Sequence, residues 1–400
     1  MDAYVLDYVR TPRGLGRDKG SLAGVAPIEL LRQLLVTLAD RNALETANVA
    51  DLILGCVTQT GEQGADLARI ALLHAGWDQG VAGMTLNRFC ASGLSACGVA
   101  AQSVHAGSAQ LAIGGGVESM SRVPMMSDGG AWYSDPAIRR STGFVHMGVA
   151  ADLVATLEGF SREALDGVAL ESHRRAALAE RDGRYLRSLC AVRNVDGEVL
   201  LDRDENVRAT LSAEKLAALP AAFVEAGAAG GDAVALQRYP QLPAIRHLHT
   251  VASAPAMADG AALLLIGSLE MAQRLDMAPR ARIRSFAEVA AEPIVMLTAG
   301  QRAAERALRS AGLPAAEIGV VEFNESFAAV ALKFRRDLEL DPERVNVNGG
   351  CIAQGHAMGA TGAILLGAAI EELERQDREF GLVAISGGAG IGTAMVVQRI

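Results

Sequence analysis

The sequence predicts an α/β protein made of two similar halves, with a segment of different character between them. A chain of 400 residues is too long for one ordinary hydrophobic core. Its 43 glycines and 4% aromatic residues suit tight strand-to-helix turns and close packing on small side chains. Two stretches, beginning at Ser92 and Thr361, also share one order: a helix of small residues, then a short apolar strand ending in glycines.

The first half alternates strands and helices from its start. Strands are expected in AYVLDYV, DLILGCV and MTLNRF, and helices around 27–40, around 64–75 and from Ser92. The strand LAIGGG (111–116) ends the first copy of the repeated unit. This alternation is typical of layered α/β folds.

The second half follows a similar course. Strands are expected in RARIRSFAEVA and IGVVEFN, and helices around 299–311, from ESFAAVALKF and from Thr361. The strand VAISGG (383–388) leads through GGAGIG into a final strand, so these glycines are better explained by a hairpin than by a dinucleotide-binding loop.

The region between the halves has charged helical stretches and loops with Asp, Gly and Pro, as in SREALDGVALESHRRAALAERDGRY. We interpret it as an insertion that folds over the first half. The expected boundaries are 1–117 for the N-terminal half, 118–250 for the insertion, 251–275 for a return to the first half, and 276–400 for the C-terminal half.

The composition of the chain disfavours several classes of function. A formal charge of −9 disfavours nucleic-acid binding, which selects basic surfaces. Five irregularly spaced cysteines and seven scattered histidines indicate neither a disulfide framework nor a metal site. The sequence shows no secretory leader and no apolar run of the roughly 18 residues that a membrane span needs. We therefore expect a cytoplasmic, metal-independent protein.

Cys90 lies where the strand MTLNRF gives way to a helix. Unpaired backbone N–H groups and the helix dipole at such a position favour a thiolate. The alternative is a buried structural cysteine.

His356 is the candidate base, because it lies in the glycine-dense loop NVNGGCIAQGHAMGATGA that precedes the second copy of the helix. If the halves pack about a pseudo-twofold axis, Cys90 and His356 face each other. Asn324, at the end of a strand, could hold a water or donate to an oxyanion, or could simply cap a helix.

These segments resemble the thiolase family (3-ketoacyl-CoA thiolases and acetyl-CoA acetyltransferases) over essentially the whole chain. NRFCASG is similar to its nucleophile segment, NESFA to its Asn-Glu-Ala-Phe motif, and NGGCIAQGHAMGATG to its Gly-His-Pro segment. Three stretches outside the candidate site are also similar to thiolase sequences: RTPRGLGRDKGSLAG, GGVESMSRVPM and LSAEKLAALPAAF.

The resemblance implies a five-layered αβαβα fold of two pseudo-repeated halves, with a loop domain covering a coenzyme A site. It implies that Cys90 carries an acyl group as a thioester and that His356 accepts the thiol proton. A water on Asn324, together with His356, would form one oxyanion hole, and the backbone N–H of Cys90 would serve the second.

Substrate contacts also follow from the resemblance. Arg208 matches an arginine near the adenine end of coenzyme A. The side chains expected to contact substrate elsewhere are His146, Met147, Ser253, Met296 and Phe327. Coenzyme A and acyl-CoA are substrates, no tightly bound cofactor is implied, and relatives are homodimers or homotetramers.

The sequence differs from the thiolase family pattern at four positions. Ser386 stands where the family usually has a second catalytic cysteine, Ala357 replaces a proline, and Pro255 replaces a serine. Cys351 occupies a position that is commonly alanine, and is either an additional core thiol or a substitute for the missing group.

Three functions are therefore compatible with the sequence. The favoured one is a working thiolase that cleaves a 3-oxoacyl-CoA or runs the reverse condensation. The second is an acyltransferase of the same fold without efficient carbon–carbon chemistry, because a serine hydroxyl is several pKa units more basic than a thiol. The third is a non-catalytic acyl-CoA-binding relative.

Overall fold

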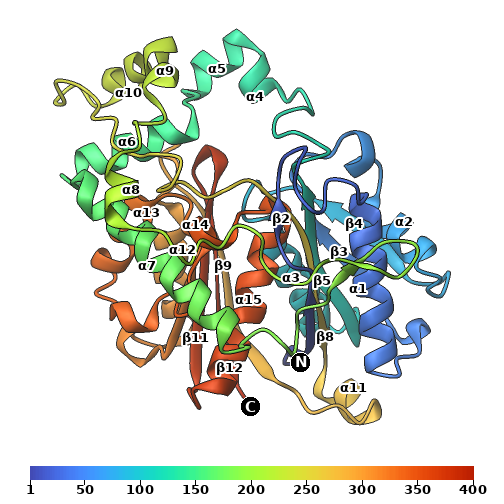
Figure 1. The fold of residues 1–400 in the computed structure, drawn as a ribbon. Coiled ribbons are helices and arrows are strands. Elements are labelled where there is room, and N and C mark those ends of the chain that lie inside the picture. Colours follow the sequence, from blue (N-terminus) through green and yellow to red (C-terminus); the bar gives the residue numbers. More distant parts are fainter.

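A computed structural model describes all residues from 1 to 400 and shows two halves side by side, with further helices above them (Figure 1). The first half contains the strands β1 (Tyr4–Arg10), β2 (Gly14–Leu15), β3 (Asp51–Gly55), β4 (Ala82–Leu86) and β5 (Leu111–Ser119), and the helices α1 (Pro27–Arg41), α2 (Leu67–His74) and α3 (Ser92–Ala106). The chain returns to it through β8 (Ala258–Gly267) and α11 (Leu269–Arg274). The second half contains the strands β9 (Ala281–Ala290), β10 (Val320–Phe323), β11 (Phe380–Gly387) and β12 (Ile391–Arg399), and the helices α12 (Ala299–Ala311), α13 (Ala328–Asp337), α14 (Cys351–Gln354) and α15 (Met358–Arg375).

The two halves repeat one strand order. Hydrogen bonding joins the first half as β4-β3-β5-β8-β1 and the second as β10-β11-β12-β9. An isolated parallel bridge between Val321 of β10 and Val345 supplies the counterpart of β4. In the first half β4, β3 and β5 pair in parallel, and β8 is antiparallel to both β5 and β1. In the second half β10 and β11 pair in parallel, and β12 is antiparallel to both β11 and β9. The repeat predicted from the helix-and-strand segments is therefore confirmed at the level of topology.

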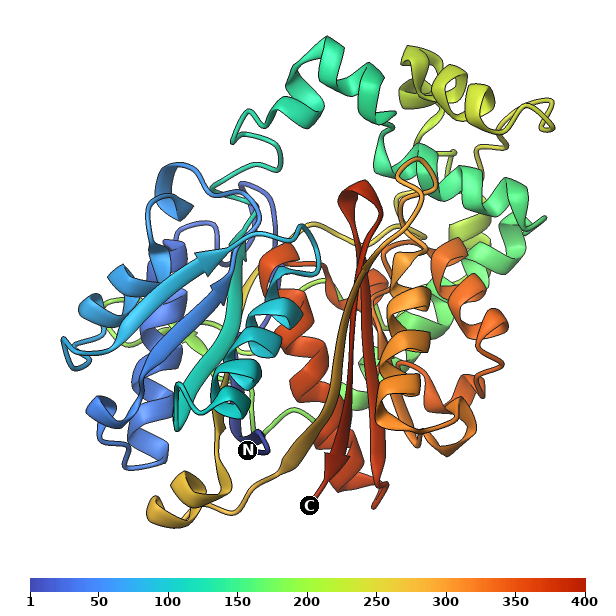
Figure 2. The ribbon, with the colours of Figure 1, turned by 180° about the vertical axis from the view of Figure 1, so that it is seen from behind.

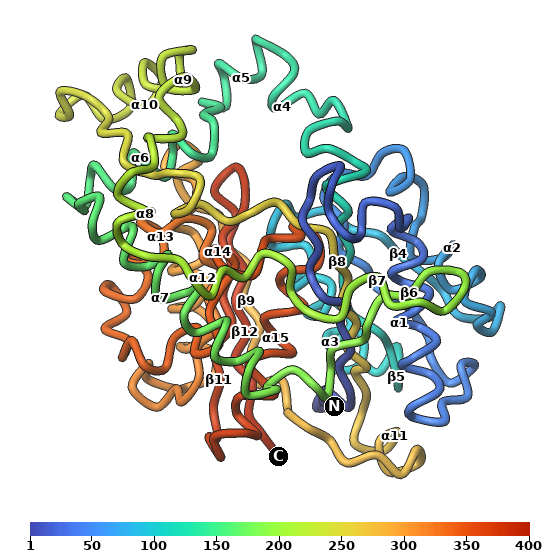
Figure 3. Tube along the Cα trace, in the orientation of Figure 1, coloured from blue at the N-terminus to red at the C-terminus, as the bar shows by residue number.

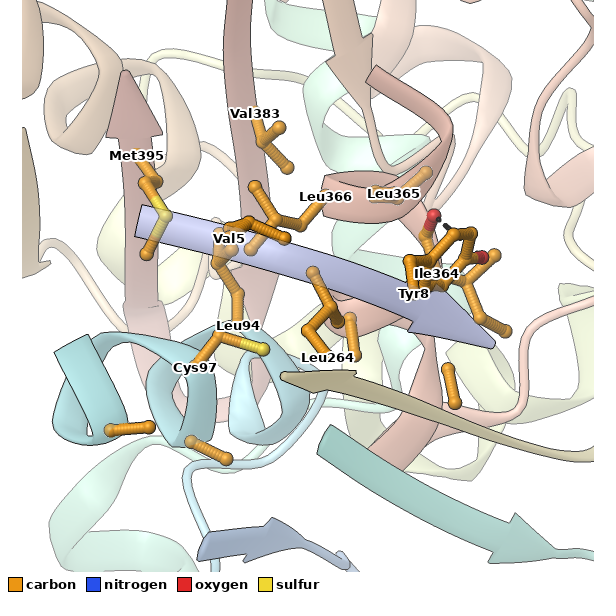
Figure 4. Packing of buried hydrophobic residues seen from close by; sticks show 14 of the residues in the cluster. Val5, Tyr8, Leu94, Cys97, Leu264, Ile364, Leu365, Leu366, Val383 and Met395 are labelled. Atoms are coloured by element: carbon orange, nitrogen blue, oxygen red, sulfur yellow. Dashed lines mark hydrogen bonds between the residues drawn. The ribbon is translucent and has the colours of Figure 1, made fainter. Parts of the chain in front are cut away.

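Helices α3 and α15 pack against each other between the two sheet regions, and α1, α2 and α12 lie outside them (Figure 2). This gives the five-layered αβαβα arrangement. The small residues that the sequence places on both helices explain the close approach, because a Cβ at Gly93 would come within 2.5 Å of the Gly359 carbonyl oxygen. Apolar side chains from both halves, among them Leu94, Leu264 and Val383, fill one core around these helices (Figure 4).

The inserted region crosses both halves instead of only the first. It contains the helices α4 (Ala131–Ser134), α5 (Pro136–Thr142), α6 (Met147–Leu157), α7 (Arg162–Arg181), α8 (Ala213–Ala217), α9 (Val224–Ala226) and α10 (Asp232–Arg238) and the short strands β6 (Val192–Arg193) and β7 (Val199–Leu201). After α7 the chain runs over to β6 and β7 beside α1 and then returns to α8 (Figure 3). Helix α7 packs on α13 and α14 of the second half. None of the helices combines the length and the apolar character needed to cross a membrane.

Candidate active site

Cys90 lies between the end of β4 and the start of α3, as the sequence predicts. The turn is tight: Phe89 has a φ of 48°, and the Ser92 hydroxyl donates to the Phe89 carbonyl oxygen while it accepts from the Arg88 N–H. β3 approaches the same turn closely, since a Cβ at Gly55 would come within 2.5 Å of the Ser92 backbone. The geometry holds the thiol at the N-terminal end of α3.

Burial controls the protonation of Cys90. Burial, followed by the nearby Glu118 carboxylate, raises the pKa of Cys90 to about 12, although the backbone N–H groups of Cys90 and Gly388 act in the opposite direction. The expectation of a thiolate in the free protein is wrong, because loss of hydration outweighs the helix terminus. The two N–H groups still converge on the sulfur, where they can stabilise the oxyanion of a bound thioester.

His356 is held by two hydrogen bonds. Its backbone N–H donates to the Ala256 carbonyl oxygen at 2.8 Å, and its Nδ1 lies 2.8 Å from the Thr361 hydroxyl oxygen. Thr361 donates its own proton to the Ala357 carbonyl oxygen, so Nδ1 carries the proton that Thr361 accepts. Nε2 is therefore the unprotonated nitrogen, and it is buried without a partner.

The imidazole of His356 is neutral at physiological pH. Burial, and then the positive charge of Arg13, lowers the pKa of His356 to about 4. A neutral ring with a free Nε2 can accept a proton, so its chemistry matches that of a general base for a buried thiol.

Asn324 lies at the end of β10, fully buried, and its backbone N–H donates to the Ala384 carbonyl oxygen. Its Nδ2 donates to the Ser326 hydroxyl at 3.1 Å, while its Oδ1 has no partner. The alternative of a helix cap is wrong, because α13 begins at Ala328 and its N-cap residue is Phe327. An unpaired buried amide oxygen is the kind of atom that a bound water or ligand satisfies.

A cavity of about 170 Å³ brings Cys90 and His356 together. Three of the predicted substrate contacts, His146, Met147 and Phe327, also line it. Burial lowers the pKa of His146, so this ring is neutral as well. The reaction cavity, as we call this space, is therefore mostly apolar, with a thiol and a neutral imidazole in its wall.

A larger cavity of about 770 Å³ adjoins the reaction cavity. The two share the lining residues Phe223, Ala254, Pro255, Ala256 and Met257. The predicted contact Arg208 lines the larger one and is exposed, and its guanidinium forms no ion pair. Two further cations, Arg17 and Lys215, line the same cavity. Phosphate groups suit such a cluster of basic side chains.

The predicted catalytic residue Asn324 and two of the predicted contacts, Ser253 and Met296, line neither of these cavities. Ser253 is fully buried, and its hydroxyl accepts from the Thr250 N–H. Met296 is fully buried in the core of the second half. The structure does not bring either side chain to the cavity surface.

Two of the four positions that depart from the family pattern, Ser386 and Cys351, are buried and line neither cavity. The Ser386 hydroxyl accepts a hydrogen bond from the Gly300 N–H at 2.9 Å, near the N-terminus of α12. Burial raises the pKa of the Cys351 thiol to about 12, with opposing and smaller effects of nearby charges. No group of three His, Cys, Asp or Glu side chains is arranged to hold a metal ion.

The sequence reasoning missed Arg13, Arg17 and Lys215. The first two lie in RTPRGLGRDKGSLAG and the third in LSAEKLAALPAAF, two stretches from which only the family resemblance was inferred. The basic residues in these stretches could have indicated a binding site for phosphate groups. The two segments lie about 200 residues apart, and only the folded chain brings Arg17 and Lys215 to the same cavity.

The chain belongs to the thiolase family. Residues 3–236 match the family model "Thiolase, N-terminal domain", and residues 277–399 match "Thiolase, C-terminal domain". The chain is 37% identical to the beta-ketoadipyl-CoA thiolase of Escherichia coli, with 100% of both chains covered. It is 35% identical to the 3-ketoacyl-CoA thiolase of Bacillus subtilis and 37% identical to that of Erwinia tasmaniensis, each with 99% of both chains covered.

Proposed function

We propose that this thiolase cleaves a 3-oxoacyl-CoA with coenzyme A, or runs the reverse condensation, through an acyl-Cys90 intermediate. The observation that carries the proposal is the pair of adjoining cavities, one with three cations and the other with Cys90 and His356 in its wall. Their shared apolar lining suits the uncharged arm that joins the phosphates of coenzyme A to its thiol. The names of the relatives agree with this substrate class.

The side chains have separate roles in the proposed reaction. Cys90 attacks the 3-keto carbon while Nε2 of His356 takes the thiol proton. The bond between C2 and C3 then breaks, its electron pair stays on C2 as the enolate of acetyl-CoA, and the protonated His356 returns its proton to that carbon. The thiol of a coenzyme A molecule next attacks the acyl carbon, its proton passes through His356 to the Cys90 sulfur, and acyl-CoA leaves. The N–H groups of Cys90 and Gly388 stabilise one oxyanion, and a water on Asn324 together with His356 stabilises the other.

The remaining assignments support the same proposal. Arg208, Arg17 and Lys215 bind the phosphates, and His146, Met147 and Phe327 contact the arm or the acyl group. Ser253 and Met296 act indirectly, by shaping the walls. We also propose that the protein is cytoplasmic, needs no tightly bound cofactor, forms a homodimer or homotetramer, and divides at residues 117, 250 and 275.

The direct test is incubation with acetoacetyl-CoA and coenzyme A, with detection of acetyl-CoA and intact-mass analysis of the protein. We expect one acetyl adduct on Cys90 and none on Cys90→Ala, which removes only one buried sulfur and keeps the fold. An undiminished adduct on the variant would contradict the role of Cys90.

One observation favours a second candidate function. Ser386 is the proposed second acid–base residue, but its hydroxyl is engaged with Gly300 and lines neither cavity. An acyltransferase without efficient carbon–carbon chemistry would acylate Cys90 rapidly and exchange the α-protons of acetyl-CoA with solvent slowly. Proton exchange measured in deuterated buffer therefore distinguishes the two functions.

A further inference from the structure

A second small cavity adjoins the reaction cavity at Cys90. The two share Cys90 and three methionines, Met125, Met147 and Met358. The second cavity is lined further by Phe89, Trp132, Tyr133 and the oxyanion-binding residue Gly388. In the proposed reaction the acyl group on Cys90 needs room beside the sulfur while coenzyme A occupies the cation-lined side. We call this second space the acyl cavity.

The walls around Cys90 are unusually rich in methionine. The chain has 12 methionines, and six of them line the acyl or the reaction cavity. These six are Met120, Met125, Met126, Met147, Met257 and Met358. Unbranched thioether side chains adapt to apolar groups of different shape. They offer nothing that binds an anion.

Aromatic rings form another wall of the acyl cavity. The ring of Trp132 lies 5.2 Å from that of Phe89 and 5.0 Å from that of Phe144, measured between centroids. Trp132 also lies over Gly388, because a Cβ built there would come within 3.2 Å of the indole. One of only two tryptophans in the chain thus packs against Gly388 in the same cavity wall as Cys90.

No lysine or arginine lines the acyl cavity or the reaction cavity. The only carboxylate in their walls is Asp128, which accepts from the Tyr133 hydroxyl. The amide of Asn87 is engaged at both ends, by the Val57 carbonyl oxygen and the Phe89 N–H. The neighbouring Arg88 is paired with Glu288.

These walls hold no cation to pair with a negative charge on the acyl group, and their side-chain donors, among them the Thr58 and Tyr133 hydroxyls, are neutral. A carboxylate placed there would lose hydrogen bonds to water, gain no positively charged partner and be repelled by the Asp128 carboxylate. An alkyl tail of the same length has no such hydrogen bonds to lose and gains apolar contacts.

We infer that the acyl group carried by Cys90 is uncharged and apolar, and that substrates ending in a carboxylate are rejected. The inference rests on the proposed function and sets this chain apart from its relative named for beta-ketoadipyl-CoA, a compound with such a carboxylate. Trp132, Met126 and Asp128 are the specificity-determining residues.

The test compares 3-oxohexanoyl-CoA with 3-oxoadipyl-CoA, which have six acyl carbons each and differ in a terminal methyl or carboxylate. We expect kcat/KM for the first to exceed that for the second by about 100-fold or more, as an uncompensated buried charge requires. Equal use of both, or preference for 3-oxoadipyl-CoA, would overturn the inference. Acetoacetyl-CoA has no tail to discriminate, so its turnover reports on the proposed function alone.

A cation added to the wall should change this preference. In Met126→Lys we expect the ratio to fall by about tenfold or more, because the ammonium pairs with the carboxylate. Asp128→Lys repeats the test from a neighbouring exposed position if the first variant fails to fold. Val195→Lys adds the same charge on the fully exposed β6–β7 turn and should leave the ratio unchanged. An unchanged ratio in both cavity variants would show that the tail does not lie in the acyl cavity.

Discussion

Arg13 is a buried cation close to the proposed base, and its removal should change the pH dependence of acylation. Its side chain is 2% exposed, its Nη2 lies 3.0 Å from Oδ2 of Asp204, and its Nη1 donates to the carbonyl oxygen of Gly355, the residue before His356. After burial, its charge is the remaining cause that lowers the pKa of His356 to about 4. Protonated His356 cannot accept the Cys90 proton, so the acid limb of acylation should lie near pH 4 to 5.

The substitution Arg13→Met keeps most of the apolar stem and removes the charge. A like charge beside a titratable group typically shifts its pKa by about one unit or more, which corresponds to about 1.4 kcal/mol or more. Loss of a neighbouring cation favours the imidazolium, so the pKa of His356 and the acid limb should both rise by about one unit. The fold should survive with a loss of about 1–3 kcal/mol, because Asp204 keeps its ion pair with Arg10 and the Arg13 backbone N–H.

The assay is the rate of acetyl transfer from acetyl-CoA to Cys90, followed by rapid quenching and intact-mass analysis from pH 4 to pH 8. Arg10→Met is the matched control, because Arg10 pairs with the same carboxylate but is not among the causes of the His356 shift. The electrostatic argument fails if Arg13→Met leaves the acid limb in place, or if Arg10→Met moves it equally.

Two other predictions concern proton transfer and stability. Ser386→Cys should raise both thiolysis and α-proton exchange if the serine limits proton transfer, whereas a large loss in Cys351→Ala with little change in Ser386→Cys would assign the role to Cys351. The His247 ring lies between Asp152 and Asp232, and hydrogen bonds to these carboxylates outweigh burial and raise the pKa of His247. Its contribution to stability is complete below about pH 6.5 and is lost as pH rises through the higher folded value. Urea unfolding at pH 6 and pH 8.5 should show a smaller difference in His247→Asn than in the parent chain, and an equal difference would contradict the assignment.

Much of the fold could be predicted because the residue pattern of each segment agrees with the place of that segment in the folded chain. The small residues after Ser92 and Thr361 predict two helices, and both form the central layer. Their equivalence in the repeat predicts that Cys90 and His356 meet, and both line one cavity. The glycine run after Ser386 forms the turn between β11 and β12, as a hairpin requires.

The site properties that could not be predicted depend on burial and on contacts between residues that are distant in the sequence. A helix N-terminus predicts a thiolate at Cys90, but the degree of burial decides the sign of the pKa shift. Ser253 and Met296 match substrate-contacting positions by motif, yet both side chains are fully buried and line neither cavity. Arg13 acquires its role from Asp204, almost 200 residues later in the chain.

The geometry of Ser386 separates the proposed chemistry into two independent parts. Acylation needs the thiol, the free Nε2 of His356 and the converging N–H groups, and none of these is hydrogen-bonded to Ser386. The Ser386 hydroxyl instead accepts from Gly300 at the N-terminal end of α12, a position that favours negative charge. A helix terminus is worth only about 1–2 kcal/mol, whereas a hydroxyl is several pKa units more basic than a thiol, so this stabilisation covers only part of the gap. Carbon–carbon chemistry at a useful rate therefore requires an acid–base group other than Ser386. His356, which is neutral and lines the reaction cavity, can serve acylation and carbon–carbon cleavage in turn.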